Sequence, residues 1–175
     1  MFYMLLLGSR YFSDAVLYIR LVPILLACGK QSGTLTHQMV SASFSQLVNC
    51  ITRETDASFL ASLYKCFRDA LRVIDGPSSL SPEIQTGIIE ATKRQLQNIA
   101  DRRRTRVSRP ATELADDKED LMLMEEMEDY ALEDMAKMLQ ALNPGHELLV
   151  AVGGVRDLGM HLDQWESGDE GDNAG

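Results

Sequence analysis

The sequence is poor in the residue types from which most catalytic and metal sites are built. Only three histidines occur, and His37, His146 and His161 are far apart in the chain. No H-E-x-x-H, G-x-S-x-G or Glu-x-x-His pattern is present. The last absence argues against a four-helix carboxylate metalloenzyme, which would be built on that motif. We therefore expect no enzyme activity, no catalytic residue, no metal and no cofactor.

Cysteine is also scarce, at three residues, and each lies within an apolar helical pattern: Cys28, Cys50 and Cys66. An odd number of cysteines without a C-x-x-C pair does not describe a disulfide framework. No histidine stands at a zinc-ligand spacing from any of them. We expect three reduced, buried thiols in an intracellular protein.

Long apolar runs are missing as well. The run that begins at Met1 stops at Gly8 without a preceding basic residue, and the next one contains Arg20 and Pro23. A membrane-spanning helix needs ~20 mostly apolar residues, so we expect neither a targeting segment nor membrane insertion.

Lysine and arginine number 17 against 26 acids, a net charge of -9. Phosphate groups would be repelled, which favours basic partners over nucleic acid.

No stretch alternates between apolar and polar residues as a half-buried strand would. Apolar residues recur at steps of three and four, which predicts an all-α fold of six helices. Helix starts are indicated at Thr36, at Thr55 or Asp56, and at Ser81 followed by a proline. Pro23 is expected to interrupt or kink the first helix, which should close at Gly29. The predicted breaks lie at 29–33, 53–55, 76–80, 106–111 and 143–145.

The first helix is predicted to begin near Tyr11 and the third near Asp56, a spacing of about 45 residues that fits a two-helix HEAT or armadillo repeat. This spacing predicts about three antiparallel helix pairs stacked as a solenoid, with an ordinary helical bundle as the alternative. The third helix has the clearest core face. Its expected core residues are Phe59, Leu60, Leu63, Phe67, Ala70, Leu71 and Ile74.

A strongly acidic segment, Glu113 to Asp134, nevertheless keeps a helical apolar stripe. The stripe consists of Leu121, Met124, Met127, Ala131, Met135, Met138 and Leu142. It needs a partner surface, so we interpret its methionines, together with Met122, as core residues packed on a neighbouring repeat. The alternative is an adaptable binding surface, because thioether side chains repack easily.

Carboxylates on the remaining faces of this helix would create a concentrated negative potential, and we expect them to bind a basic peptide. The predicted cargo-binding residues are Glu119, Asp120, Glu125, Glu126, Glu128, Asp129 and Glu133. Asp116, Glu119 and Asp120 also have a spacing that could share a cation. A solvated face is the favoured interpretation, because oxygen-rich metal sites normally need a loop of fixed geometry.

A basic patch precedes the acidic segment: Arg102, Arg103, Arg104, Arg106 and Arg109. Its composition is that of a localisation signal or a nucleic-acid patch, but no aromatic residues are interleaved. We favour an intramolecular role in which these arginines pair with the acids of the following helix. Such pairing would partly mask the acids from a ligand.

Composition shifts divide the chain into five segments. An atypical apolar N-terminal helical segment spans 1–33, and helical repeats span 34–104. A basic-to-acidic linker spans 105–115, and an acidic helix with a short further helix spans 116–159. Glycine and acidic residues dominate 160–175, which we expect to be a disordered tail.

Four stretches, read in order, resemble a known family. They are FLASLYKCF from Phe59, ATKRQL from Ala91, ADRRRTR from Ala100 and DDKED from Asp116. Their order and character are similar to the importin-β (karyopherin-β) family, in particular the importin-beta-three branch. The resemblance covers roughly 34–159. It implies a piece of a HEAT-repeat nuclear import receptor, since members of the family are several times longer.

Several functional expectations follow from this resemblance. It implies a scaffold for protein import into the nucleus that binds basic cargo and is regulated by the Ran GTPase. Phe-Gly nucleoporins would be further partners, and the protein would occur in both cytoplasm and nucleus. The alternative from the residues alone is a stand-alone acidic helical bundle acting as an adaptor or a chaperone-like binding protein.

Overall fold

The computed structural model describes residues 15–108 and 118–158 of the chain, and in these ranges it contains six α-helices and no strand. The helices are α2 (Ala15–Gln31), α3 (His37–Arg53), α4 (Ala57–Val73), α5 (Pro82–Val107), α7 (Lys118–Leu142) and α8 (Leu148–Arg156), with a 3-10 turn, η1 (Pro77–Ser79). The predicted all-α, HEAT-type fold is confirmed. The apolar run that begins at Met1, the linker residues 109–115, Asp116 and the predicted acidic tail lie outside the described residues.

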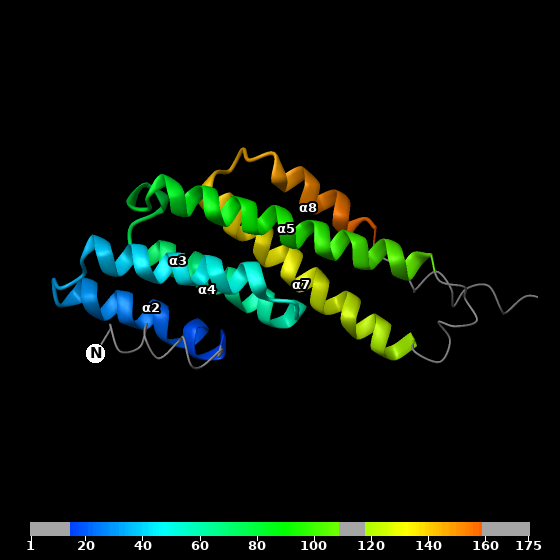
Figure 1. Cartoon of the computed structure of the whole chain (residues 1–175), viewed down its shortest axis with the longest axis horizontal. Helices are drawn as coiled ribbons and strands as arrows, with labels where there is room; N and C mark the ends of the chain where they lie inside the picture. Colours follow the sequence, from blue (N-terminus) through cyan, green and yellow to red (C-terminus); the bar gives the residue numbers. More distant parts are fainter. Residues whose placement is uncertain (1–14, 109–117, 159–175) are drawn as a thin grey trace, which may run out of the picture.

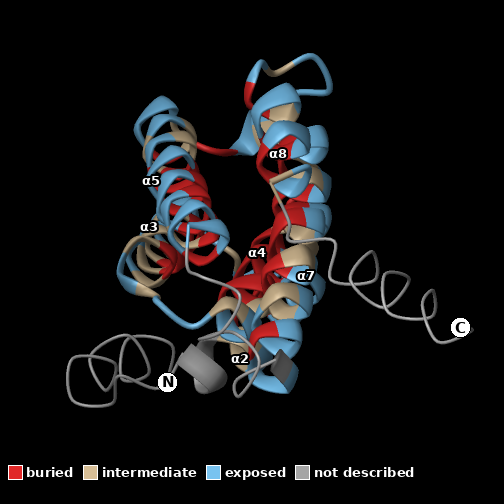
Figure 2. Cartoon of the chain, turned by 90° about the vertical axis from the view of Figure 1, so that its right-hand side faces the viewer, coloured by how far each residue is buried: buried red, intermediate tan, exposed pale blue. Residues whose placement is uncertain are grey.

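The helices form two layers. One layer contains α2, α4 and α7, which run in the same direction, and the other contains α3 and α5, which run the opposite way (Figure 1). Helix α8 runs in the direction of α3 and α5 and packs on both α7 and α5. The most extensive interface joins α4 to α7, and α3 packs against α5 across the second layer. Buried residues concentrate between the layers (Figure 2). Successive helices therefore alternate between layers, as in stacked helical hairpins.

Local sequence signals explain most of the helix boundaries. The Thr36 hydroxyl accepts a hydrogen bond from the Met39 amide at 3.2 Å, and the Asp56 carboxylate accepts from two amides of the first turn of α4. Ser81 caps α5 with Pro82 at the first helical position. These side chains satisfy amides that have no partner within the helix. The predicted helix starts at these three positions are confirmed.

The first described helix differs from the prediction. It continues through Pro23 without interruption and ends at Gln31 rather than at Gly29. A proline inside a helix removes one hydrogen bond and costs about 3 kcal/mol. Val22 and Leu26, on either side of the proline, are buried in the main core. Their packing favours the continuous helix.

The core is apolar with a few hydrogen-bonded polar groups. Phe44 of α3 and Phe67 of α4 meet edge to face, with ring centroids 4.9 Å apart. Gln95 of α5 donates to the carbonyls of Ile51 at 2.6 Å and Glu54 at 2.9 Å, which satisfies the open end of α3. Gln95 thus joins α5 to the end of α3 by hydrogen bonds, in addition to the packing between these two helices.

Two expectations about buried residues are wrong. Phe59 was placed on the core face of its helix but is 39% exposed, because the neighbouring helices cover the side of α4 that carries Leu60 and not the side that carries Phe59. All three cysteines were expected to be buried, yet Cys28 is exposed on α2 and Cys50 is only half-buried. Cys66 is buried, which raises its pKa to about 12 and makes the thiol unreactive.

Candidate functional site: the two faces of helix α7

Helix α7 packs on α4 through the second half of its predicted apolar stripe. Ala131, Met135 and Met138 are buried there, as expected. At the same interface Arg68 of α4 donates to the Asp134 carboxylate at 3.0 Å. This half of α7 is therefore held by both apolar contact and a half-buried ion pair.

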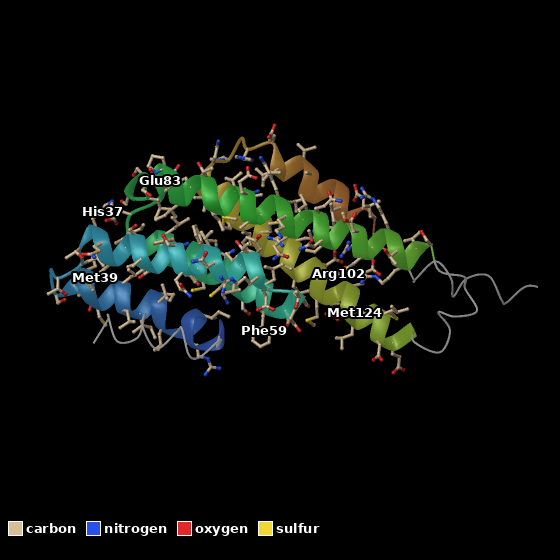
Figure 3. All side chains as sticks on the ribbon, viewed as in Figure 1. His37, Met39, Phe59, Glu83, Arg102 and Met124 are labelled. Atoms are coloured by element: carbon tan, nitrogen blue, oxygen red, sulfur yellow. The ribbon has the colours of Figure 1, made fainter. Side chains whose placement is uncertain are left out.

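The first half of α7 is less completely covered than the second half, although Leu121 is buried there. Met124 was expected in the core but is 48% exposed, and Met122 is exposed as well. Figure 3 shows Met124 and Phe59 on the side of the molecule away from α5 and α8. The buried position at this level is Glu128, which is only 2% exposed. The expected core role of these two methionines is wrong because the partner of this half of α7 is the basic end of α5.

Three arginines of α5 surround the buried Glu128 carboxylate. Arg102 and Arg103 donate through their Nε atoms at 3.0 and 3.1 Å, and Arg106 donates through both terminal nitrogens. Burial by itself raises the pKa of the Glu128 carboxyl, but the hydrogen bonds and charge of these arginines outweigh it and hold that pKa below its ordinary value. Glu128 is therefore ionised in the folded protein at neutral pH.

Arg103 extends this cluster to a third helix. It is 1% exposed and donates to the Asp129 carboxylate at 2.9 Å. Its other terminal nitrogen donates to the carbonyls of Val155 and Arg156 at 3.3 and 3.1 Å, at the end of α8. One guanidinium thus joins α5, α7 and the carbonyl end of α8, where a positive charge is favourable.

The basic patch is therefore largely occupied within the protein. Arg102, Arg103 and Arg106 pair with acids of α7, so the intramolecular interpretation is confirmed for these three. Arg104 points to solvent and pairs with Asp101 of its own helix at 3.2 Å. Arg109 lies outside the described residues. In Figure 3 Arg102 lies where α5 passes α7.

The acids predicted to bind cargo are divided between two faces. Glu128 is buried and cannot reach a surface ligand, because its carboxylate faces α5. Asp129 is half-buried and committed to Arg103, and Glu125 is half-buried. The exposed members of the set are Glu119, Asp120, Glu126 and Glu133. The arginines thus mask Glu128 and Asp129 but not these four.

Two signals in the sequence point to the buried cluster and were missed. The buried face of α5 follows Ile88, Gln95 and Ile99, and the same period continues to Arg103 and Arg106. The buried face of α7 likewise places Glu128 one turn from Ala131 and Leu132. Where two helices pack through apolar stripes, charged residues that continue those stripes are expected to lie opposite each other and to pair.

Metal binding and membrane insertion have no support in the described parts of the chain. Residues 15–108 and 118–158 hold no group of three or more histidine, cysteine or acidic side chains suited to a metal ion. The helices among these residues are all too short or too polar to cross a bilayer.

Successive helices alternate between layers, and an ionic cluster joins neighbouring hairpins. This arrangement is typical of a helical-repeat scaffold rather than a closed bundle. A family model, importin repeat 6, matches residues 59–146, which is just over half of the chain. The matched range includes all but the first two residues of α4, the whole of α5 and α7, and the arginines and acids that pair around Glu128. The chain belongs to the importin-β family and has the character of a nuclear transport receptor scaffold. Neither curated proteins nor solved structures yielded a match.

Proposed function

We propose that the exposed acids of α7 bind basic localisation signals as part of a nuclear transport receptor. One observation carries the proposal: Glu119, Asp120, Glu126 and Glu133 are exposed on one ordered helix, in a chain of the importin-β family. Carboxylates fixed on a helix keep their spacing, so a basic peptide does not have to order them when it binds. Membership of a scaffold family that is not enzymatic agrees with a binding role.

The expected affinity is set by contact rather than by long-range attraction. At ~0.15 M salt the screening length is about 8 Å, so only basic side chains close to the helix gain appreciably. Each exposed ion pair contributes roughly 0.2–1 kcal/mol. A signal would therefore need several lysines or arginines in register with α7.

Titration with a fluorescent Lys/Arg-rich peptide tests the proposal. The test variant combines Glu119→Gln, Asp120→Asn and Glu126→Gln. Loss of three contacts at roughly 0.2–1 kcal/mol each should weaken binding about threefold or more. Circular dichroism should show unchanged helicity.

The matched control removes three exposed acids from elsewhere, with the changes Glu90→Gln, Asp101→Asn and Glu147→Gln. It alters the net charge by the same amount but leaves α7 intact. We expect it to bind nearly as well as the parent. Equal weakening by both variants would mean that only net charge matters, and no weakening by either would exclude α7 as the site.

Regulation by Ran, contact with Phe-Gly nucleoporins and shuttling between cytoplasm and nucleus belong to the same proposal, and family membership supports them. Ran regulation predicts that the GTP-bound form of Ran releases the bound peptide while the GDP-bound form does not. Release by both forms, or by neither, would contradict it. Shuttling predicts that a fluorescently labelled chain accumulates in the nucleus when nuclear export is blocked.

A further inference from the structure

The two ends of the layer formed by α2, α4 and α7 differ in charge. Helix α2 packs on α4 at one end, and α7 packs on α4 at the other (Figure 1). The residues of α2 include Arg20 and Lys30 and no acid. Those of α7 include eight acids against two lysines, and three of the acids, Glu128, Asp129 and Asp134, pair with arginines of α5 and α4. Five acids remain, so one end of the layer is basic and the other is acidic.

The outer side of α2 presents a regular stripe of exposed residues. Arg20, Ile24 and Cys28 recur every four residues, opposite the buried Val22 and Leu26. Ile24 is 57% exposed, which is high for a large aliphatic side chain in the middle of a helix. This face has the form of a packing surface, with an apolar centre beside a positive charge.

The outer side of α7 presents a stripe of matching chemistry. Glu119, Leu123, Glu126, Tyr130 and Glu133 follow one another at steps of three and four, and all are exposed. The Tyr130 hydroxyl donates to Glu126 at 2.9 Å, which orders both side chains. Leu123 and Tyr130 supply apolar surface between the three carboxylates.

We propose that the α2 face of one copy of this chain docks on the α7 face of another, and so continues the layer from copy to copy. Arg20 would meet the carboxylates of α7, and Ile24 would pack against Leu123 and Tyr130. The same displacement brings α3 of the second copy toward α8, whose Val150 is 81% exposed. This association goes beyond peptide binding, and because it uses three of the same carboxylates a bound basic peptide would compete with it.

Charge complementarity favours the contact between α2 and α7 over symmetric contacts in which the same face of each copy is used. Two α2 faces would offer Arg20 no carboxylate, because α2 contains no acid, and two α7 faces would oppose carboxylates to carboxylates. A head-to-tail contact leaves one free face at each end. It therefore produces a series of growing oligomers rather than a closed dimer, and the series should shorten as salt is added.

Sedimentation velocity on the full chain, over a range of concentrations, tests the proposal with two charge-reversed variants. One carries Arg20→Glu, and the other carries Glu119→Lys and Glu126→Lys. Each variant alone should need about threefold to tenfold more protein to associate, since attraction at exposed pairs becomes repulsion. Both variants change exposed side chains, and unchanged helicity would show that they fold.

Mixing the two variants separates this contact from nonspecific aggregation. In the mixture every contact between unlike copies is charge-complementary, so association should return to the parent level. Failure of the mixture to recover, or a parent chain that stays monomeric at every concentration, overturns the proposal.

Chemical cross-linking through the exposed thiol of Cys28 tests which faces are in contact, independently of the charge variants. A flexible bismaleimide should join Cys28 of one copy to the new thiol at position 133 in a Glu133→Cys variant, and Cys28→Ser should abolish that product. Mass spectrometry of the digest identifies the linked peptides. A product that joins Cys28 only to Cys28 would show a symmetric contact and overturn the head-to-tail arrangement.

Discussion

Replacing Glu128 by glutamine removes the negative charge at the centre of the interface between α5 and α7 while keeping the size of the side chain. The carboxylate is the counter-charge for Arg102, Arg103 and Arg106. Arg103 retains Asp129 after the change. Arg106 is the more vulnerable, because its buried Nε has no hydrogen-bond partner among the described residues and its other nitrogens donate to Glu128.

The loss of one partner from a buried ion pair typically costs 3–5 kcal/mol, because the remaining charge stays buried without compensation. Glutamine keeps one acceptor oxygen, so we expect a value near the lower end, about 3 kcal/mol. For a chain of this size that corresponds to a fall in Tm of roughly 6–12 °C. Urea unfolding followed by circular dichroism gives the free energy directly.

Two further variants make this expectation refutable. Glu126→Gln makes the same chemical change two residues away on the exposed face and should alter the free energy of unfolding by no more than about 0.5 kcal/mol. Glu128→Leu combined with Arg106→Met removes the carboxylate together with the most vulnerable of its three arginines, while Arg103 keeps Asp129 and Arg102 is partly exposed to water. This double variant should recover most of the loss. If Glu128→Gln is as mild as Glu126→Gln, the buried cluster does not stabilise the fold in the way described.

The same cluster predicts how stability depends on pH. Burial alone raises the pKa of Glu128, but the three arginines hold it below its ordinary value in the folded chain. A depressed carboxyl pKa contributes stability that is fully present above the unfolded value of about 4.3 and is lost as pH falls through the folded pKa. The difference in unfolding free energy between the parent and Glu128→Gln should therefore shrink in acid. A difference independent of pH would contradict the assignment.

Two smaller predictions concern local backbone and capping, and both are measured by urea unfolding. Gly154→Ala should stabilise the chain by about 0.5–1 kcal/mol, because no atom lies within 4 Å of the added Cβ and alanine favours the helix. Gly76→Ala is its control and should destabilise, since Gly76 has φ of 104°. Asp56→Ala should cost about 1 kcal/mol, because it removes the acceptor of the Ser58 and Phe59 amides at the start of α4.

Helix content and most helix boundaries were predictable from the sequence, for local reasons. Capping by Thr36, Asp56 and Ser81 depends on residues three or fewer positions away, so the sequence contains all the necessary information. The continuation of α2 through Pro23 was not predictable in this way. Whether a helix tolerates an internal proline depends on packing with other helices.

The sequence by itself determined that α7 is an amphipathic helix rich in carboxylates, because helical period and composition are properties of the segment alone. Only the tertiary structure decided which of those carboxylates is buried. Glu126 and Glu128 are two positions apart, yet Glu126 faces solvent and Glu128 faces three arginines of α5. Residues two apart point to different sides of a helix, and which side is covered depends on where the neighbouring helix lies. The position of a neighbouring helix is a property of the whole stack rather than of any one segment.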